Sequence, residues 1–335
     1  MKRITAVGAG SWGTALGIVA ARAGCDVRLW SRNELIVDSI NHHHLNPMYL
    51  ANIELPATVC ATTDIGQAVK GADLVLLTVP SQAVRTILHA MLISLSPRML
   101  LVSAAKGIEI DSGLRISQVV QEVVAEEFAP RFVCLSGPSF AREVVEQQPT
   151  AIVAASERRA DSETVQSVLS LGNLRIYTND DVIGTELGGS VKNVIAIAAG
   201  MVAALGFGAN SIAALITRGL AEMARLALNQ GAKLETLMGL AGLGDLVLTC
   251  TSAVSRNRFV GQELAKARPL EEITAGMNEV AEGVKTAAAV KQLAARTGVE
   301  MPITDEVYAV LYQGKTARAA ASDLMTRPLR SEFYT

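Results

Sequence analysis

Short apolar runs alternate with helical stretches along the first half of this 335-residue chain. The runs occupy residues 3–8, 26–30, 73–79, 99–105, 131–136, 150–156 and 174–178. Most of the intervals between them have helical periodicity, for example residues 11–23, 81–94 and 112–128. Strands that are apolar on both faces and alternate with helices indicate an α/β domain, a doubly wound and mostly parallel sheet covered on both sides.

The pattern changes after about residue 180, where the strand signal stops and helical periodicity continues almost to the end of the chain. Residues 211–231 give the clearest helical pattern, with Gly231 as the expected C-terminal cap. We therefore predict a sheet domain over residues 1–188, followed by an all-helical domain over residues 189–335.

Composition agrees with two domains and limits the partners. A domain usually holds about 150 residues, and half of this chain is hydrophobic, so there is enough apolar surface for two cores. The net charge is −2, without a basic footprint, so we expect no nucleic-acid partner. The longest apolar region, residues 193–216, is interrupted by glycines and an asparagine. We interpret it as two buried helices and expect no stable membrane insertion.

The cysteines and histidines argue against a metal site. Cys25, Cys60, Cys134 and Cys250 are far apart, which disfavours a zinc site and a secreted disulfide framework. Three consecutive histidines lie within residues 41–44, but consecutive residues cannot all face one metal ion from a helix. We expect no bound metal and a reducing, cytoplasmic compartment.

A glycine motif follows the first apolar run and opens a helical pattern. Its glycines, Gly8, Gly10 and Gly13, have the spacing of a dinucleotide-binding turn. The first glycine permits a tight turn, the second lets the backbone approach a pyrophosphate, and the third lets helix and strand pack closely. The helix N-terminus offers N–H groups to the phosphates. Together with the alternating pattern, the motif predicts a Rossmann-type dinucleotide-binding domain.

The residue after the second strand bears on the choice of dinucleotide. Sites that prefer NAD usually place an acid there to bind the ribose hydroxyls. This chain has Ser31 at that position and Arg32 next to it. An arginine can stack on adenine and pair with a 2′-phosphate, so we predict that NADP is used at least as well as NAD.

Polar residues follow two later strands of the predicted sheet, at the edge where ligands collect in such folds. Lys106 comes directly after an apolar run, and we predict that it binds an anion or a carbonyl oxygen. Gly137 and Ser139 lie in a turn of small side chains that would let a substrate approach the backbone. A plain tight turn explains the same residues equally well.

The helical half contains two further stretches of candidate chemistry. Lys192 enters an apolar helical stretch, where a lysine is costly unless it is paired or functional. Burial favours the neutral amine, which suits proton transfer, although a lysine extending toward solvent is an equal alternative. Asp245 lies between apolar flanks and needs a cation, for which Lys192 is a candidate. Ser255, Arg256 and Asn257 offer side chains suited to a phosphate.

Longer motifs carry a more specific resemblance. "GAGSWGTA", "AAKGIE", "LSGPSFA", "DDVIGTELGGSVKN", "ITRGLAEM", "GLAGLGDLVLTCTS", "SRNR" and "VAEGVKTA" resemble, in order and spacing, the bacterial NAD(P)-dependent glycerol-3-phosphate dehydrogenases. The resemblance runs from residue 4 to about residue 328. It implies interconversion of dihydroxyacetone phosphate and sn-glycerol 3-phosphate, a reaction that supplies the glycerol backbone of phospholipids.

The resemblance also implies roles for single residues. Lys192 matches the catalytic lysine of the family. The matched substrate contacts are Lys106, Gly137, Ser139, Lys192, Asp245, Ser255, Arg256 and Asn257. The matched cofactor contacts are Ser11, Trp12, Arg32, Lys106, Ala141, Arg256, Val280 and Glu282, to which the glycine motif adds Gly8, Gly10 and Gly13. Trp12 replaces a Phe or Tyr that is more usual in the family, which keeps an aromatic wall.

Together these features predict that the dinucleotide delivers a hydride to the ketone while Lys192, held by Asp245, acts as general acid or base. We expect the substrate cleft at the domain boundary, and the apolar helices could serve a homodimer. β-Hydroxyacid dehydrogenases are an alternative, but they carry an asparagine four residues after the lysine. Here that position is Ala196, and the asparagine is Asn193. A cofactor-sensing regulator would need a recognition module that the helical half does not show.

Overall fold

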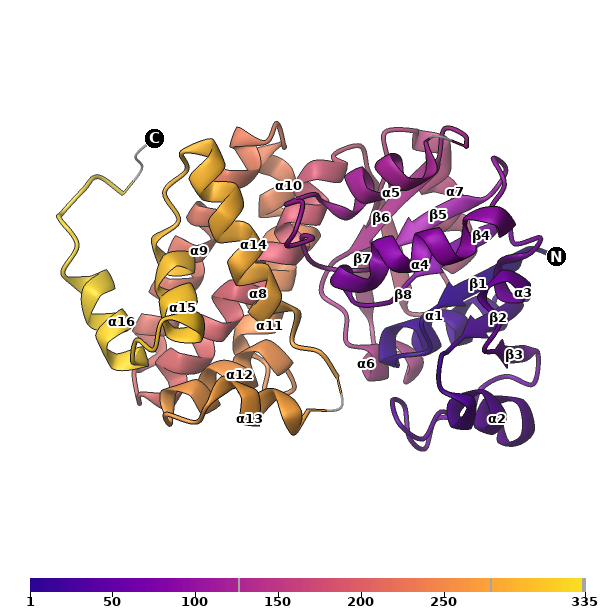
Figure 1. Cartoon of the computed structure of the whole chain (residues 1–335), viewed down its shortest axis with the longest axis horizontal. Coiled ribbons are helices and arrows are strands. Elements are labelled where there is room, and N and C mark those ends of the chain that lie inside the picture. The colour runs from indigo at the N-terminus through magenta and orange to yellow at the C-terminus, as the bar shows by residue number, and fades with distance from the viewer. Residues whose placement is uncertain (126, 278, 333–335) are drawn as a thin grey trace. The chain divides into compact units, whose positions relative to one another are not determined.

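The computed structural model describes residues 1–125, 127–277 and 279–332. The chain forms two compact units, which are labelled by element in Figure 1. The first unit comprises Met1–Lys106 and Leu114–Val182, and the second comprises Gly107–Gly113 and Ile183–Thr335.

The first unit is built on one twisted sheet with the strand order β3-β2-β1-β4-β5-β6-β7-β8. The strands are β1 Arg3–Val7, β2 Asp26–Trp30, β3 Val59–Thr62, β4 Leu74–Leu77, β5 Leu100–Ser103, β6 Arg131–Ser136, β7 Thr150–Ala155 and β8 Leu174–Asn179. Neighbouring strands run parallel except β6 and β7, which are antiparallel. The mostly parallel sheet is therefore confirmed, and each of the seven apolar runs overlaps a strand. The four-residue edge strand β3 was not expected.

Helices cover both faces of this sheet (Figure 1). They are α1 Ser11–Arg22, α2 Glu34–His43, α3 Ile65–Val69, α4 Val84–Met91, α5 Ile116–Val124, α6 Ala141–Val145 and α7 Arg159–Leu169, with short 3₁₀ turns at Ser81–Ala83 and Leu92–Ser94. In β4, Leu74 and Leu76 belong to the core cluster that contains α1, whereas Val75 and Leu77 belong to the cluster of α4 and α5. Because successive side chains point to opposite faces, a strand buried on both sides must be apolar throughout.

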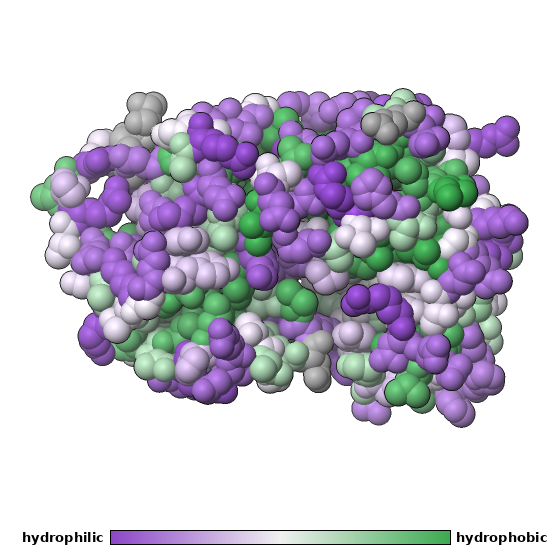
Figure 2. Space-filling view, in the orientation of Figure 1, coloured by the Kyte–Doolittle hydropathy of each residue, from purple (hydrophilic) through white to green (hydrophobic). Residues whose placement is uncertain are grey.

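The second unit consists of helices around one core cluster. They are α8 Val182–Ala204, α9 Ala209–Asn229, α10 Leu234–Met238, a π-helical turn at Leu240–Gly244, α11 Asp245–Thr251, α12 Arg256–Ala265, α13 Leu270–Ala275, α14 Glu282–Thr297, α15 Pro302–Tyr312 and α16 Ala317–Met325. Figure 2 shows polar side chains over much of the visible surface, with apolar side chains between them.

Helix α8 is the central element of the second unit. Among the described residues it is the one helix long and apolar enough to cross a membrane, and 83% of its most apolar window is buried inside the protein. The apolar region over residues 193–216 thus divides between α8 and α9, as predicted. Helix α12 crosses α8 so closely that a Cβ on Gly200 would lie 2.0 Å from the Arg258 carbonyl oxygen. Glycine is required there because the two backbones touch.

The units divide at a different place from the predicted boundary. Residue 188 lies inside α8, and the chain passes from one unit to the other at Val182, where this helix begins. A continuous helix moves as one body, so the division falls at its end rather than within it. No pattern in the sequence indicates that residues 107–113, which lie within the sheet domain in chain order, pack with the helical unit.

Candidate active site

The glycine turn has the geometry that its spacing predicts. Gly8 has a φ of +115°, a conformation that strongly favours glycine. A Cβ on Gly13 would lie 1.9 Å from the Gly8 carbonyl oxygen, so only glycine lets α1 begin this close to the turn. A Cβ on Gly10 would meet nothing within 4 Å, and the N-terminus of α1 has no side-chain cap. The turn therefore combines open space beside Gly10 with helix N–H groups, which suits a pyrophosphate.

A buried asparagine that sequence reasoning missed braces the turn. Asn46 is fully buried, and its Nδ2 donates hydrogen bonds of 2.9 Å to both the Ala9 carbonyl and Thr14 Oγ1. Its Oδ1 has no hydrogen-bond partner. Ser11 Oγ donates to the Tyr49 carbonyl from the same loop. The segment that follows α2 thus fixes the shape of the glycine turn, a role that no pattern in the sequence announces.

The residues after β2 match the expectation for the ribose end of a dinucleotide. Ser31 is buried and Arg32 is exposed. The next residue, Asn33, caps α2 through its Oδ1, which accepts a hydrogen bond from the Leu35 N–H. The exposed Arg32 therefore lies between a buried strand end and a fixed helix start.

Lys106, Gly137 and Ser139 come together at the carboxyl ends of β5 and β6. Lys106 Nζ and Ser139 Oγ each donate a 3.1 Å hydrogen bond to the Gly137 carbonyl oxygen. Gly137 has a φ of +133°, and a Cβ there would lie 2.9 Å from the Ile152 Cα. The turn is therefore tight, which agrees with the alternative of a plain tight turn. It also brings a cation and a hydroxyl together at the carboxyl ends of the strands, where ligands bind in such folds.

The centre of the second unit is a buried ion pair. Lys192 Nζ lies 2.7 Å from Asp245 Oδ1 and 2.6 Å from Thr249 Oγ1. The side chains of Lys192 and Asp245 are only 8% and 2% exposed, so the lysine does not extend into solvent. Thr249 Oγ1 donates to the Asp245 carbonyl, which leaves its lone pairs for the ammonium. The predicted pairing of Lys192 with Asp245 is confirmed, and Thr249 is a third partner that was not predicted.

The thiol next to this pair is held in its neutral form. Burial raises the pKa of Cys250 to about 12, although the charge of Lys192 acts in the opposite direction. At neutral pH the thiol therefore adds no further negative charge beside Asp245.

Two asparagines join the middle of α8 to the starts of α12 and α14, beside the ion pair. Asn257 Nδ2 donates to Asn193 Oδ1, and Asn257 Oδ1 accepts from the Gly283 N–H, both at 2.9 Å. A Cβ on Gly283 would lie 2.6 Å from the Asn193 carbonyl, which explains the glycine. The Asn257 amide thus serves the scaffold of α8, α12 and α14, and its predicted contact with a phosphate stays a prediction.

Arg256, the last of the predicted site cations, lies at the start of α12. Ser255 is buried and caps the helix through its Oγ, which accepts from the Arg258 N–H. Arg256 is half exposed, donates to the Val280 carbonyl at 2.9 Å and lies 3.0 Å from a Glu279 carboxylate oxygen. The structure therefore brings Arg256 and Val280 together, as two of the predicted cofactor contacts require, and Glu282 opens α14 just beyond them.

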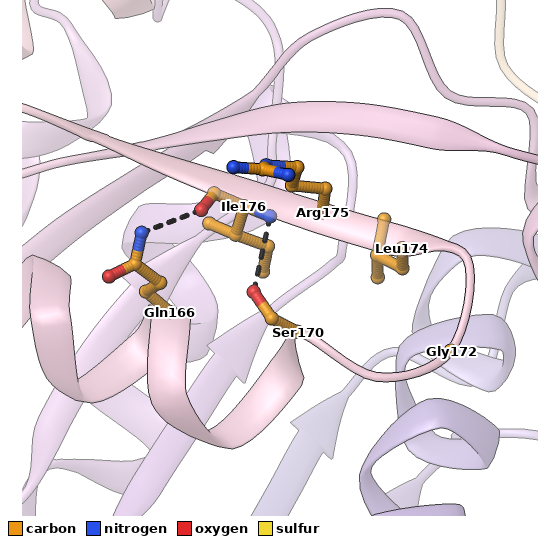
Figure 3. A pocket seen from close by; sticks show the side chains of 6 residues that line it. All are labelled: Gln166, Ser170, Gly172, Leu174, Arg175 and Ile176. Atoms are coloured by element: carbon orange, nitrogen blue, oxygen red, sulfur yellow. Dashed lines mark hydrogen bonds between the residues drawn. The ribbon is translucent and has the colours of Figure 1, made fainter.

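A surface hollow of about 390 Å³ lies elsewhere, at the start of β8 (Figure 3). Gln166 Nε2 donates to the Ile176 carbonyl, and Ser170 Oγ accepts from the Ile176 N–H, so the polar groups tie α7 to the edge strand. Arg175 is the charged residue in its lining. Since β8 and β1 are separated by four strands, the hollow is no part of the glycine-turn site. Among the described residues, no group of three His, Cys, Asp or Glu side chains could hold a metal ion.

A doubly wound sheet with this glycine turn, joined to a helical unit that buries a lysine–carboxylate pair, is the architecture of two-domain, dinucleotide-dependent dehydrogenases. Family models described as the N-terminus and C-terminus of NAD-dependent glycerol-3-phosphate dehydrogenase match residues 3–162 and 181–322. The chain belongs to this family.

Relatives match over the whole chain. It is 51% identical to glycerol-3-phosphate dehydrogenase [NAD(P)+] of Koribacter versatilis, with all of both chains covered. It is also 51% identical to the enzyme of that name from Nitratidesulfovibrio vulgaris, over 98% of this chain and all of the relative. The crystal structure of glycerol-3-phosphate dehydrogenase from Coxiella burnetii has 39% identity and a TM-score of 0.93, covering 97% of this chain and 99% of that one.

Proposed function

We propose that this protein interconverts dihydroxyacetone phosphate and sn-glycerol 3-phosphate with NAD(P) as the redox partner. The observation that carries the proposal is the Lys192 ammonium, held inside the helical unit by Asp245 and Thr249. A buried lysine with two polar partners can exchange a proton with a substrate oxygen. Membership of the glycerol-3-phosphate dehydrogenase family selects the substrate.

The first unit offers residues that fit a dinucleotide. The open space at Gly10 and the uncapped start of α1 suit the pyrophosphate, and Arg32 suits a 2′-phosphate. Trp12 and Ala141 lie partly buried against the core of the same unit, where they would present apolar surface. When bound, the dinucleotide supplies or accepts the hydride.

Lys192 is the proposed general acid and base. When the ketone is reduced, its oxygen gains negative charge, and the Lys192 ammonium stabilises that charge and then donates a proton to it. Asp245 keeps the amine protonated and fixes its position, and Thr249 restricts the side chain further. In the oxidative direction the neutral amine accepts the proton of the substrate hydroxyl, and Asp245 stabilises the resulting ammonium.

Phosphate recognition is assigned to Arg256, with Ser255 and Asn257 beside it at the start of α12. Arg256 is half exposed and is oriented by the Val280 carbonyl, so its remaining N–H groups can serve an anion. Binding energy from a phosphate remote from the reacting carbon would position the carbonyl. In the first unit, Lys106, Gly137 and Ser139 remain the proposed substrate contacts.

The biological setting is part of the proposal. The product sn-glycerol 3-phosphate would supply phospholipid synthesis. A cytoplasmic location suits the four cysteines, which are all free thiols. A homodimer and the absence of membrane insertion stay predictions.

The test is a set of absorbance assays of NADPH and NADH with dihydroxyacetone phosphate. A matched set replaces this substrate by unphosphorylated dihydroxyacetone and by a 3-oxo acid, the substrate class of the alternative β-hydroxyacid dehydrogenase. Rapid oxidation of NADPH or NADH with dihydroxyacetone phosphate, but not with unphosphorylated dihydroxyacetone, supports the proposal. Cofactor oxidation with the oxo acid alone would overturn it. So would the absence of cofactor oxidation with all three compounds.

A further inference from the structure

One segment of the chain leaves the sheet unit and packs into the helical unit. Residues Gly107–Gly113 belong to the second unit, although the residues on both sides belong to the first. Ile108 is completely buried in the core cluster of the second unit, and Ile110 packs against the same cluster. A fully buried isoleucine makes extensive apolar contact, so the segment is firmly attached there.

Polar contacts close the segment into a compact turn. The Gly113 N–H donates to the Glu109 carbonyl at 2.8 Å, and Ser112 Oγ donates to the Glu109 carboxylate. Arg296, at the end of α14, donates to the Ser112 carbonyl at 3.3 Å. The segment is thus held at both ends, by Ile108 in the core and by Arg296 at its far side.

The residue that enters this segment is Lys106. Its Nζ contacts the Gly137 carbonyl in the first unit, while its main chain continues directly into Gly107 and Ile108. Each residue of extended chain spans at most about 3.6 Å, so the Cα of Lys106 stays within about 7 Å of that of Ile108. If Ile108 moves so far that this Cα–Cα distance would be exceeded, the main chain of Lys106 must move with it.

We propose that Ile108 is a positioning residue for Lys106, and that the Gly107–Gly113 segment is a tether that couples this lysine to the helical unit. The inference rests on the proposed function, in which Lys106 contacts the substrate. It assigns to Ile108, an apolar residue buried in the core of the helical unit, an effect on substrate turnover that acts through the lysine alone.

The test is a double-mutant cycle on kcat/KM for dihydroxyacetone phosphate, with Ile108→Ala, Lys106→Ala and the double variant, assayed at raised enzyme concentration. Because misplacing a substrate contact by about 1 Å can cost up to about 100-fold, we expect Ile108→Ala to lower kcat/KM about tenfold. In the Lys106→Ala background the same change should cost less than about twofold, since the lysine it positions is gone. Ile108→Val, which keeps most of the buried apolar side chain, should recover most of the activity.

Ile303→Ala is the matched control. Ile303 is also a buried isoleucine of the same cluster, on α15, but it is far from Lys106 along the chain. Its effect on kcat/KM should be the same with and without Lys106. If Ile108→Ala costs the same factor in both backgrounds, or if Lys106→Ala leaves kcat/KM at the wild-type value, the tether inference is wrong while the proposed function stands. If the wild-type protein does not reduce dihydroxyacetone phosphate, the proposed function itself fails.

Discussion

Lys192 Nζ lies 2.7 Å from an Asp245 carboxylate oxygen in a place that water scarcely reaches. Removing two charges from water costs free energy that their attraction often fails to repay, so such a pair is weak evidence for stability. A buried pair of titratable groups is more typical of a functional site. Its neighbours are consistent with that, because Thr249 adds a second ligand to the ammonium and Cys250 stays a neutral thiol.

The hydroxyl of Thr249 should matter to catalysis. Thr249→Val keeps the shape of the side chain but removes the oxygen that accepts from Lys192, so the ammonium loses that hydrogen bond. A hydrogen bond to a charged group contributes about 1.5–3 kcal/mol. We therefore expect kcat/KM to fall by roughly tenfold to 100-fold, and Thr249→Ser to retain activity within about threefold. Equal losses in the two variants, measured in steady-state assays, would argue against a role for the hydroxyl.

The two glycines at the start of α1 should fail in different ways. In Gly13→Ala the new methyl group overlaps the Gly8 carbonyl, so the thermal midpoint should fall along with NADPH affinity. In Gly10→Ala the methyl group meets no protein atom, so the thermal midpoint should hold while the Kd for NADPH rises by about tenfold or more. Scanning fluorimetry and fluorescence titration measure the two quantities. Unchanged NADPH affinity in Gly10→Ala would place the pyrophosphate elsewhere.

Arg32 should set the preference between the two dinucleotides. In Arg32→Ala we expect kcat/KM with NADPH to drop about tenfold or more, with NADH changed less than about threefold, because only NADPH carries the 2′-phosphate. Arg98→Ala is the control. Arg98 is also exposed, but it precedes β5 and so lies at the amino ends of the parallel strands, whereas the glycine turn lies at their carboxyl ends. The same NADPH-to-NADH ratio in wild type and Arg32→Ala would remove the assignment.

A buried glutamate in the helical unit should make stability depend on pH. Glu222 accepts hydrogen bonds from the Ile303 and Thr304 N–H groups at the start of α15, and burial raises its pKa to about 7. The folded protein therefore favours the protonated acid. The contribution of this group to stability is complete below its unfolded pKa, near 4.5, and is lost as the pH rises through 7.

Glu222→Gln isolates this effect because its amide oxygen can still accept from α15 while it carries no titrating proton. Urea denaturation of both proteins from pH 4.5 to 8 should show wild type losing about 3 kcal/mol relative to the variant. A difference between the two that stays constant with pH would mean that Glu222 has an ordinary pKa in the folded protein.

Sequence patterns predicted the features that rest on local rules. Strands buried on both faces are apolar throughout, so the runs that became β1, β4 and β5 were visible, and the glycine turn follows from backbone geometry alone. The pairing of Lys192 with Asp245 could be inferred because each buried charge needs a partner.

Features set by contacts between distant parts of the chain were not predictable. The strand β3 has only four residues, and their burial alternates, so it shows no apolar run. It is recognised as a strand only through its pairing with β2 at the outer side of the sheet. Asn46 and Asn193 bind groups far away in sequence, and an asparagine in a loop or helix gives no sign of this. Ile108 looks like any residue of a strand–helix connection, and only the core around it shows that it belongs to the helical unit.

The most direct test of the account is the turnover of Lys192→Ala with NADPH and dihydroxyacetone phosphate. The variant leaves Asp245 buried without its cation, so its folding is checked by thermal midpoint and by the Kd for NADPH, to whose predicted contacts Lys192 does not belong. We predict that kcat/KM falls by about 1,000-fold or more while the Kd stays within about twofold, because the proton donor alone is lost. Turnover within about tenfold of wild type in a folded, NADPH-binding variant would contradict the role of Lys192.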